Sequence, residues 1–152
     1  MDDLDELLVF ALEEQRYALN VASVERAVRL VEITPLSAAL DIVMGIINVQ
    51  GRVIPVVNLR KQLRLPERAP TLSDQLIIAR TSRRRVALLV DSVGGVIERP
   101  SEDLVTAGEI LPGIVHIRGV VKLEDGVILI HDLDQCLSLE EERLLDEAIA
   151  NG

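Results

Sequence analysis

The chain contains an internal repeat, and this repeat limits its possible folds more than any other feature of the sequence. Segment 18–24 (ALNVASV) aligns with segment 87–93 (ALLVDSV) without a gap. The offset is 69 residues at both ends of the alignment (87 − 18 and 93 − 24). Each copy belongs to a pair of apolar runs around a short polar break, as in 7–21 and 76–90. Such a pair is typical of a β-hairpin. A constant offset over a whole hairpin indicates a duplicated structural unit.

A second pair of similar hairpins accompanies the first pair. Segments 45–59 (GIINVQGRVIPVVNL) and 119–133 (GVVKLEDGVILIHDL) are both apolar, contain a turn glycine and end in Asn-Leu or Asp-Leu. Asp125-Gly126 is a strong hairpin signal, because both residue types tolerate the positive φ of a tight turn. Gln50-Gly51 is a weaker signal of the same kind.

The two repeats predict an all-β chain with two small barrels. Each repeat holds two hairpins and an intervening strand, and about five short strands separated by turn signals are typical of a small barrel. Segment 45–59 is almost continuously apolar, so we expect both of its faces to be buried between packed barrels. The connection at 65–73 contains two prolines and several charges, and should lie on the surface.

Helical signals are confined to short connections and to the C-terminus. Segments 35–43 and 101–104 each predict a turn or two of helix, and Ser101 is a suitable cap for the second. The C-terminal segment 138–150 is the clearest helix. It begins with the Ser-x-x-Glu spacing of a capping box and continues with apolar residues at helical period.

Charge and composition argue against nucleic acid and membrane partners. The net charge is −9, which repels phosphate backbones and anionic membranes, and aromatic residues make up only 1%. A base-stacking surface is therefore not expected. No apolar run approaches the roughly 18–20 residues of a membrane span, so we expect no direct membrane insertion. Arg83–Arg85 is the one basic run; we expect a solvated hairpin tip, with an anion site as the alternative.

The single cysteine and the N-terminus indicate the compartment. Cys136 has no second cysteine with which to form an internal disulfide, which favours a reducing environment. Met1 is followed by two aspartates rather than by the basic and apolar regions of a signal peptide. We therefore expect a cytoplasmic protein.

The residues that usually carry catalysis do not form a recognisable set. His116 and His131 have no metal-ligand spacing, and Asp132 beside His131 should point to the opposite face of a strand. Gly94-Gly95 lacks the spacing of a phosphate-binding loop and predicts a bulge or a close backbone approach. We expect no catalytic, cofactor or metal site, and hence a binding or scaffolding module. The alternative, a small enzyme or ligand-binding barrel, would need titratable residues converging on a pocket.

Two segments resemble the CheW-like family of chemotaxis coupling proteins. Segment 45–60 (GIINVQGRVIPVVNLR) is similar to the family pattern G-x-x-N-x-R-G-x-x-x-P-x-x-D-L-R, and 86–93 (VALLVDSV) is similar to its vGLlVDsV. Gly119 and the hairpin at 125–126 fit the closing segment of the family. The resemblance extends from about Leu7 to the last helix.

This resemblance implies a fold and a function. The fold would be one domain of two intertwined five-stranded SH3-like barrels, with short connecting helices and a C-terminal helix. We expect the first subdomain to comprise mainly 16–64 and the second mainly 7–15 and 74–137. The protein would be a non-catalytic adaptor that links the cytoplasmic tips of methyl-accepting chemoreceptors to the regulatory domain of a CheA-type histidine kinase. A scaffold of a non-flagellar assembly, such as a pilus-motility pathway, is the alternative.

The resemblance also indicates candidate protein-binding residues. They lie on one strand and on one hairpin tip: Val24, Arg26, Asn48, Gln50, Gly51 and Arg52. Three positions depart from the family pattern, because Gln50 replaces arginine, Arg26 replaces glutamate and Asn58 replaces aspartate. Loss of a guanidinium removes a bidentate charged donor, which predicts a specialised set of partners. A plain solvated turn at 50–52, an ordinary strand at Val24 and Arg26, and relaxed selection for coupling remain alternatives.

Overall fold

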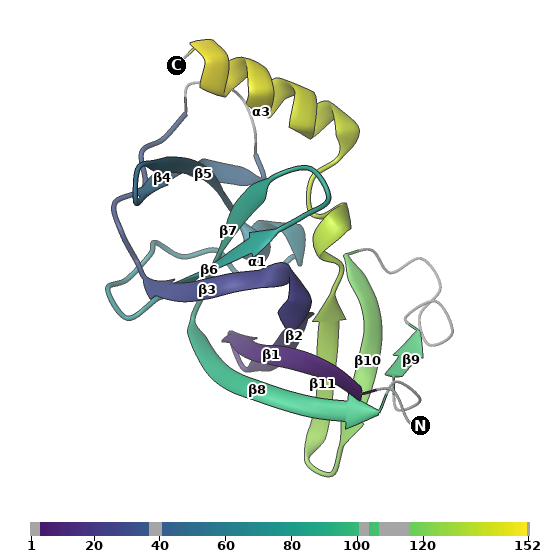
Figure 1. Cartoon of the computed structure of the whole chain (residues 1–152). Helices are drawn as coiled ribbons and strands as arrows, with labels where there is room; N and C mark the ends of the chain where they lie inside the picture. Colours follow the sequence, from purple (N-terminus) through teal and green to yellow (C-terminus); the bar gives the residue numbers. More distant parts are fainter. Residues whose placement is uncertain (1–3, 37–40, 101–103, 107–115, 152) are drawn as a thin grey trace.

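The computed structural model describes residues 4–36, 41–100, 104–106 and 116–151, and strands dominate them (Figure 1). The strands are β1 (Leu4–Leu12), β2 (Gln15–Asn20), β3 (Val24–Arg29), β4 (Val43–Val49), β5 (Arg52–Val57), β6 (Gln75–Arg80), β7 (Arg85–Val90), β8 (Ser92–Pro100), β9 (Leu104–Thr106), β10 (Ile117–Leu123) and β11 (Gly126–His131). The helices are α1 (Leu59–Gln62), α3 (Leu139–Asn151) and the 3-10 turns η1 (Val21–Ser23) and η3 (Leu133–Gln135). The expected all-β class with a C-terminal helix is confirmed.

The strands form two sheets with the same topology. One sheet has the order β3-β6-β7-β5-β4, and the other has the order β8-β1-β2-β11-β10-β9. Figure 1 shows the five-stranded sheet in the upper half of the molecule, with α3 beyond it, and the six-stranded sheet in the lower half. Under the sequence repeat, β1–β2 corresponds to β6–β7, β3 to β8, and β4–β5 to β10–β11. Both orders then match strand for strand, and β9 is the one addition.

The two repeats exchange their first hairpins. β2 runs parallel to β11, with Tyr17 opposite Leu129, so the hairpin β1–β2 completes the sheet of the second repeat. In the same way β7 runs parallel to β5, with Ala87 opposite Val56, so β6–β7 completes the sheet of the first repeat. The two halves of the chain are therefore intertwined.

Sheet membership differs from the subdomain limits expected from the sequence. Residues 15–20 pair with β1 and belong to the six-stranded sheet, and 75–90 pair with β3 and β5 in the five-stranded sheet. The physical reason is that a hairpin pattern specifies its own two strands and says nothing about the strand that pairs with its outer edge. The six-stranded sheet also exceeds the expected five strands, because the three residues of β9 pair with β10.

Among the described residues, three apolar clusters form the core, one against each sheet and one shared by both sheets. The cluster of the five-stranded sheet contains Ile47, Ile54, Val56, Leu76, Ile78 and Ala87. The cluster of the six-stranded sheet contains Leu7, Ala18, Val121, Ile128 and Ile130. The shared cluster takes the opposite faces of the same strands and includes the stacked rings of Phe10 and Tyr17. Successive side chains point to opposite faces of a strand, so these strands are buried on both faces, as their apolar runs indicated.

The C-terminal helix begins with the expected capping box. The Ser138 backbone N–H donates to Glu141 Oε1 at 2.8 Å, and the Glu141 N–H donates to Ser138 Oγ at 3.1 Å. The short helices expected at 35–43 and 101–104 fall largely on 37–40 and 101–103, which lie outside the described residues. At the described ends of these two segments, Pro35 is not helical and Leu104 begins β9.

Gly45 occupies a position that tolerates no side chain. Thr34 and Ile46 exchange two backbone hydrogen bonds of 2.8 Å, which draws the chain before β4 directly over Gly45. A Cβ on Gly45 would lie 2.3 Å from the Thr34 carbonyl oxygen, and its φ of 155° is unusual for any other residue. The glycine that opens the 45–60 motif is therefore required by close backbone approach.

We predict that Gly45→Ala lowers the free energy of unfolding by about 3 kcal/mol or more, because backbone must move to relieve the contact. Gly51→Ala is the matched control. Gly51 also has a positive φ, of 81°, but a Cβ added there would have no atom within 4 Å. We expect a loss of about 1 kcal/mol at this position. Urea denaturation of both variants measures the difference, and equal losses would contradict the role assigned to the Thr34 contact.

Candidate functional site

The tip of the β4–β5 hairpin is a tight turn built by the motif itself. Gln50 and Gly51 have φ angles of 52° and 81°, the pair of positive values that a type I′ turn needs. Asn48 Oδ1 accepts a hydrogen bond of 2.9 Å from the Gly51 N–H, and this bond stabilises the turn. Val49 and Arg52 close it as the last pair of the ladder. Asn48 and Gly51 thus have a structural role whatever partner the tip contacts.

Gln50 and Arg52 point away from this framework. Both side chains are exposed, and neither makes a hydrogen bond or an ion pair within the described part of the chain. A glutamine in the left-handed region is uncommon, since glycine, asparagine and aspartate dominate there. The exposed tip is therefore compatible with binding, and its stabilising hydrogen bond comes from Asn48 rather than from the Gln50 side chain.

The other candidate residues lie on β3. Val24 is half-buried against the shared cluster and lies opposite Ala79 of β6. The register shifts between Val24 and Arg26, and Arg26 is exposed opposite Ile78. Glu25, at the shift, forms an ion pair of 2.5 Å with Arg85 of β7. Val24 thus belongs mainly to the core, and Arg26 is the residue that β3 offers to solvent.

The two groups of candidate residues do not form a single contact set. β3 and β4 are the opposite edges of the five-stranded sheet. No hydrogen bond or ion pair joins Val24 or Arg26 to residues 48–52 in the ranges the structure describes. A link exists through Arg85, which pairs with Glu25 and lines a surface hollow together with Arg52.

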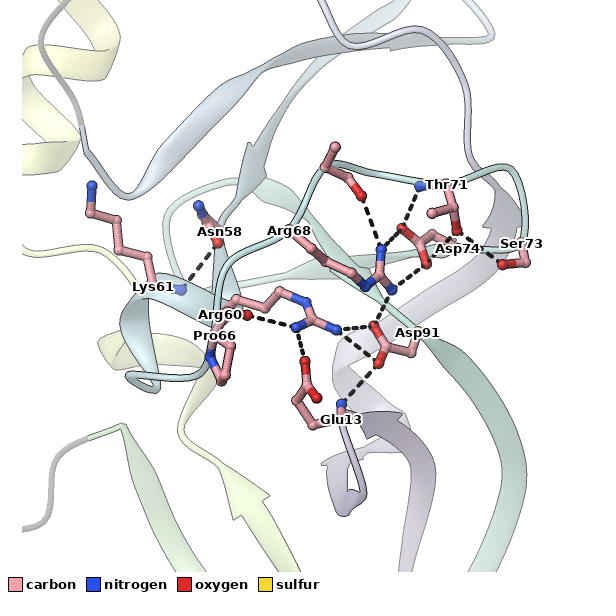
Figure 2. Close-up of polar contacts among 11 residues, drawn as sticks. Glu13, Asn58, Arg60, Lys61, Pro66, Arg68, Thr71, Ser73, Asp74 and Asp91 are labelled. Carbon is pink, nitrogen blue, oxygen red and sulfur yellow. Dashed lines mark hydrogen bonds and ion pairs between the residues drawn. The ribbon is translucent and has the colours of Figure 1, made fainter.

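Motif residues Arg60 and Asp91 meet in a charged network that no sequence signal indicated (Figure 2). Arg60 Nη2 donates to both carboxylate oxygens of Asp91, at 2.7 and 2.9 Å, and Arg60 Nη1 donates to Glu13 and to the Pro66 carbonyl. The Glu13 N–H donates to Asp91 at 2.8 Å. Burial alone would lower the pKa of Arg60, but the hydrogen bonds with Glu13 and Asp91 outweigh it and raise the pKa above its ordinary value.

A second arginine extends this network into the 65–73 connection. Arg68 donates to both oxygens of buried Asp74, at 2.8 and 2.9 Å, and to Asp91 at 2.7 Å. The hydrogen bonds from Arg68 hold the pKa of Asp74 below its usual value despite burial. The connection between the repeats is thus fixed to the corner between β7 and β8.

Asn58 retains a structural function although it replaces aspartate. Its Oδ1 accepts the Lys61 N–H at 3.1 Å and so caps α1, and its Nδ2 donates to Glu67 at 2.9 Å. Asparagine and aspartate are comparable helix caps. This departure therefore has a local explanation and requires no change of partner.

The Arg83–Arg85 run is not simply a solvated hairpin tip. Arg84 pairs through Nε with both oxygens of Glu142, at 3.1 and 3.2 Å, and through Nη2 with Asp146. Both acids lie on α3, so Arg84 attaches the C-terminal helix to the β6–β7 hairpin. The expectation of a solvated tip is wrong for Arg84, because the partner helix lies more than 50 residues away in sequence (142 − 84).

The buried histidine and cysteine form a structural cluster. His131 Nε2 lies 3.1 Å from Gln62 Oε1, and Gln62 Nε2 donates to the Cys136 carbonyl at 2.6 Å. Burial lowers the pKa of His131 to about 4 and raises the pKa of the Cys136 thiol to about 12. At neutral pH the imidazole is uncharged and the thiol is protonated, which suits neither acid–base nor nucleophilic chemistry. No cluster of three or more metal-ligating side chains occurs among the described residues.

Comparison with known proteins identifies the family. A family model described as the CheW-like domain matches residues 6–141. The chain belongs to the CheW-like family. The chemotaxis protein CheW of Thermotoga maritima is 33% identical over 132 residues, covering 87% of each chain. That of Rhizobium meliloti is 29% identical over 138 residues, covering 90% of this chain and 89% of the relative.

A solved structure agrees with this assignment. The scaffolding protein TtCheW from Thermoanaerobacter tengcongensis superposes with a TM-score of 0.81 at 26% identity, over 93% of this chain and 96% of that one. The resemblance inferred from the motifs is confirmed. The chain is a scaffold or adaptor of the chemotaxis signal-transduction class. No helix in the described ranges is long and apolar enough to cross a membrane.

We predict that Arg60→Ala lowers the free energy of unfolding by about 2–3 kcal/mol, because it leaves Glu13 without its cation and Asp91 with Arg68 alone. The Arg60 side chain is only 10% exposed, whereas both acids keep some access to water, which limits the loss. Lys61→Ala, at the exposed neighbouring position, should cost less than about 0.5 kcal/mol. Urea denaturation at neutral pH tests both variants, and similar losses for the two would contradict the structural role of the network.

We predict a histidine-dependent loss of stability in mild acid. Burial lowers the folded-state pKa of His131 from 6.5 to about 4. The neutral imidazole therefore contributes fully to the free energy of unfolding above pH 6.5, and this contribution is lost as the pH falls towards 4, because the unfolded chain binds the proton first. Proton linkage predicts that the free energy of unfolding falls by about 2 kcal/mol between pH 7 and pH 5. His131→Gln should lack this part of the pH dependence, whereas His116→Gln, which keeps His131, should retain it. The test is the urea midpoint of each variant measured between pH 7 and pH 5. Midpoints that fall equally with pH in the parent and in His131→Gln would contradict the prediction.

Proposed function

We propose that this protein couples the cytoplasmic tips of methyl-accepting chemoreceptors to the regulatory domain of a CheA-type histidine kinase, in the cytoplasm. The observation that carries the proposal is the CheW-like match over residues 6–141. The nearly complete structural overlap with a scaffolding CheW supports it, because the fold that would hold both partners is present in full. The chain would act without catalysis, by holding kinase and receptor in a fixed relation.

The exposed parts of the candidate site support this proposal. Arg26 and Gln50 project from rigid strands and a tight turn, so their backbone positions cost little to organise on binding. Charge at both positions differs from the family pattern: β3 carries a cation where glutamate is usual, and the tip is neutral where arginine is usual. A matched partner would therefore place an acidic group opposite Arg26 and a neutral hydrogen-bonding group opposite Gln50. We propose that the protein serves a specialised receptor or kinase.

We predict micromolar or tighter binding to one kinase regulatory domain from the same genome, measured by titration calorimetry at moderate salt. Arg26→Ala and Gln50→Ala should each weaken binding to kinase or receptor tip by about threefold to tenfold, as expected for interface-rim polar residues. Arg29→Ala is the matched control, because Arg29 is also an exposed arginine on β3. It should change affinity less than twofold.

Three outcomes separate the alternatives. Binding to a kinase of a pilus-motility pathway would replace the flagellar assignment with a scaffold of that assembly. Parent-like affinity of both site variants for every partner would show that the site lies elsewhere on the molecule. The absence of binding to any kinase domain or receptor tip, with a folded sample, would overturn the coupling proposal.

A further inference from the structure

A basic hollow lies between β5, the β6–β7 hairpin and α3. Its volume is about 430 Å³. It is lined by Arg52, Val53, Ile54, Pro55, Arg80, Arg83, Arg84, Arg85 and Ile149. We call this surface the arginine hollow. Its size lies within the range of ligand-binding pockets.

The arginine hollow concentrates positive charge in an acidic protein. It holds five of the 16 basic residues of a chain whose net charge is −9. Two of the five are neutralised from within the chain: Arg84 by two acids of α3, and Arg85 by Glu25. Arg52, Arg80 and Arg83 are exposed and make no side-chain hydrogen bond or ion pair within the described residues. Like charges gathered in this way repel one another unless an anion accompanies them.

The guanidinium groups define the chemistry of the anion. Arginine presents a planar fork of donors that matches the two oxygens of a carboxylate or phosphate. The chain itself contains a guanidinium–carboxylate contact at the edge of the hollow, where Arg84 Nε donates to both oxygens of Glu142. The three exposed arginines line the same hollow as Arg84 and offer their guanidinium donors to a carboxylate from outside.

The apolar part of the lining favours a peptide over a simple anion. Val53 is 51% exposed and Ile149 is 37% exposed, so aliphatic surface lies next to the cations. An inorganic anion gains nothing from this surface, whereas an acidic peptide with an aliphatic side chain would bury it. Nucleic acid fits poorly, because the overall charge repels phosphate backbones and the single phenylalanine and single tyrosine, Phe10 and Tyr17, are buried in the core.

We propose that the arginine hollow binds an acidic segment of a partner protein, with carboxylates on Arg52, Arg80 and Arg83 and an aliphatic side chain against Val53 and Ile149. This goes beyond coupling to receptor and kinase, since the hollow would accept such a segment from any protein that carries one. Arg52 borders both the hollow and the β4–β5 turn, so a bound segment would lie next to Gln50.

The test uses a fluorescein-labelled peptide of alternating glutamate and leucine residues, with fluorescence anisotropy as the readout. The parent protein should bind it at about 50 mM NaCl and bind it at least fivefold more weakly at about 300 mM, because added salt screens the charges. The matched peptide with glutamine in place of glutamate should bind at least tenfold more weakly. Failure of the parent to bind the acidic peptide below about 1 mM would overturn the proposal.

Two double variants test the location of binding. Arg52→Gln with Arg83→Gln removes two exposed cations from the hollow, and should weaken peptide binding at least tenfold while circular dichroism stays unchanged. Arg29→Gln with Arg64→Gln removes the same charge from exposed positions outside the hollow, and should weaken it less than threefold. Equal losses of peptide affinity in the two double variants would indicate general electrostatic attraction and would overturn the assignment of binding to the arginine hollow.

Competition and sedimentation test the kind of occupant. Inorganic phosphate should displace the peptide only at a concentration at least tenfold above that of the unlabelled peptide. Displacement at equal concentration would mean a simple anion site and would overturn the peptide assignment. Self-association of the parent that is lost in Arg52→Gln with Arg83→Gln would assign the hollow to a second copy of this chain instead. These readouts contain no kinase or receptor, so they succeed or fail separately from the coupling proposal.

Discussion

The arrangement of this molecule depends on the ion pair between Arg60 and Asp91. Arg60 follows β5 of one sheet, Asp91 joins β7 of that sheet to β8 of the other, and Glu13 lies in the turn of the exchanged hairpin β1–β2. The network therefore links the crossing at Asp91, where the chain passes from the five-stranded to the six-stranded sheet, with the end of β5 and with the β1–β2 turn. A buried guanidinium with three acceptors is costly to break, because any carboxylate left alone loses its compensating charge.

This structural role separates motif residues that build the fold from the exposed residues that are candidates for binding. Gly45, Asn48, Arg60 and Asp91 act through a close backbone approach, a turn hydrogen bond and an ion pair, and Asn58, which departs from the pattern, still caps α1. Gln50, Arg26 and Arg52 are exposed and can vary without disturbing those contacts. A scaffold needs this separation, because its partners must recognise a surface whose shape stays constant.

The shared apolar cluster gives the scaffold its rigidity. Strands of both sheets contribute alternate side chains to it, so neither sheet can move without disturbing the other. Arg84 extends the same rigidity to α3 by pairing with Glu142 and Asp146. The sequence held a partial signal of this contact, since the two acids are four residues apart and share one helix face. Their partner could not be inferred, because it lies in a distant hairpin.

The sequence by itself determined the strands, the turns, the C-terminal helix and the family, because each depends on local signals such as alternation, turn glycines and the Ser138–Glu141 capping box. It also placed Gln50 and Arg52 at a hairpin tip. Only the tertiary structure decided that the repeats exchange hairpins, that Arg60 meets Asp91, and that Arg52 shares a hollow with Arg80 and Arg83. The physical reason is that the two hairpins carry similar apolar patterns, so either could complete either sheet. Contacts between residues far apart in sequence select one pairing.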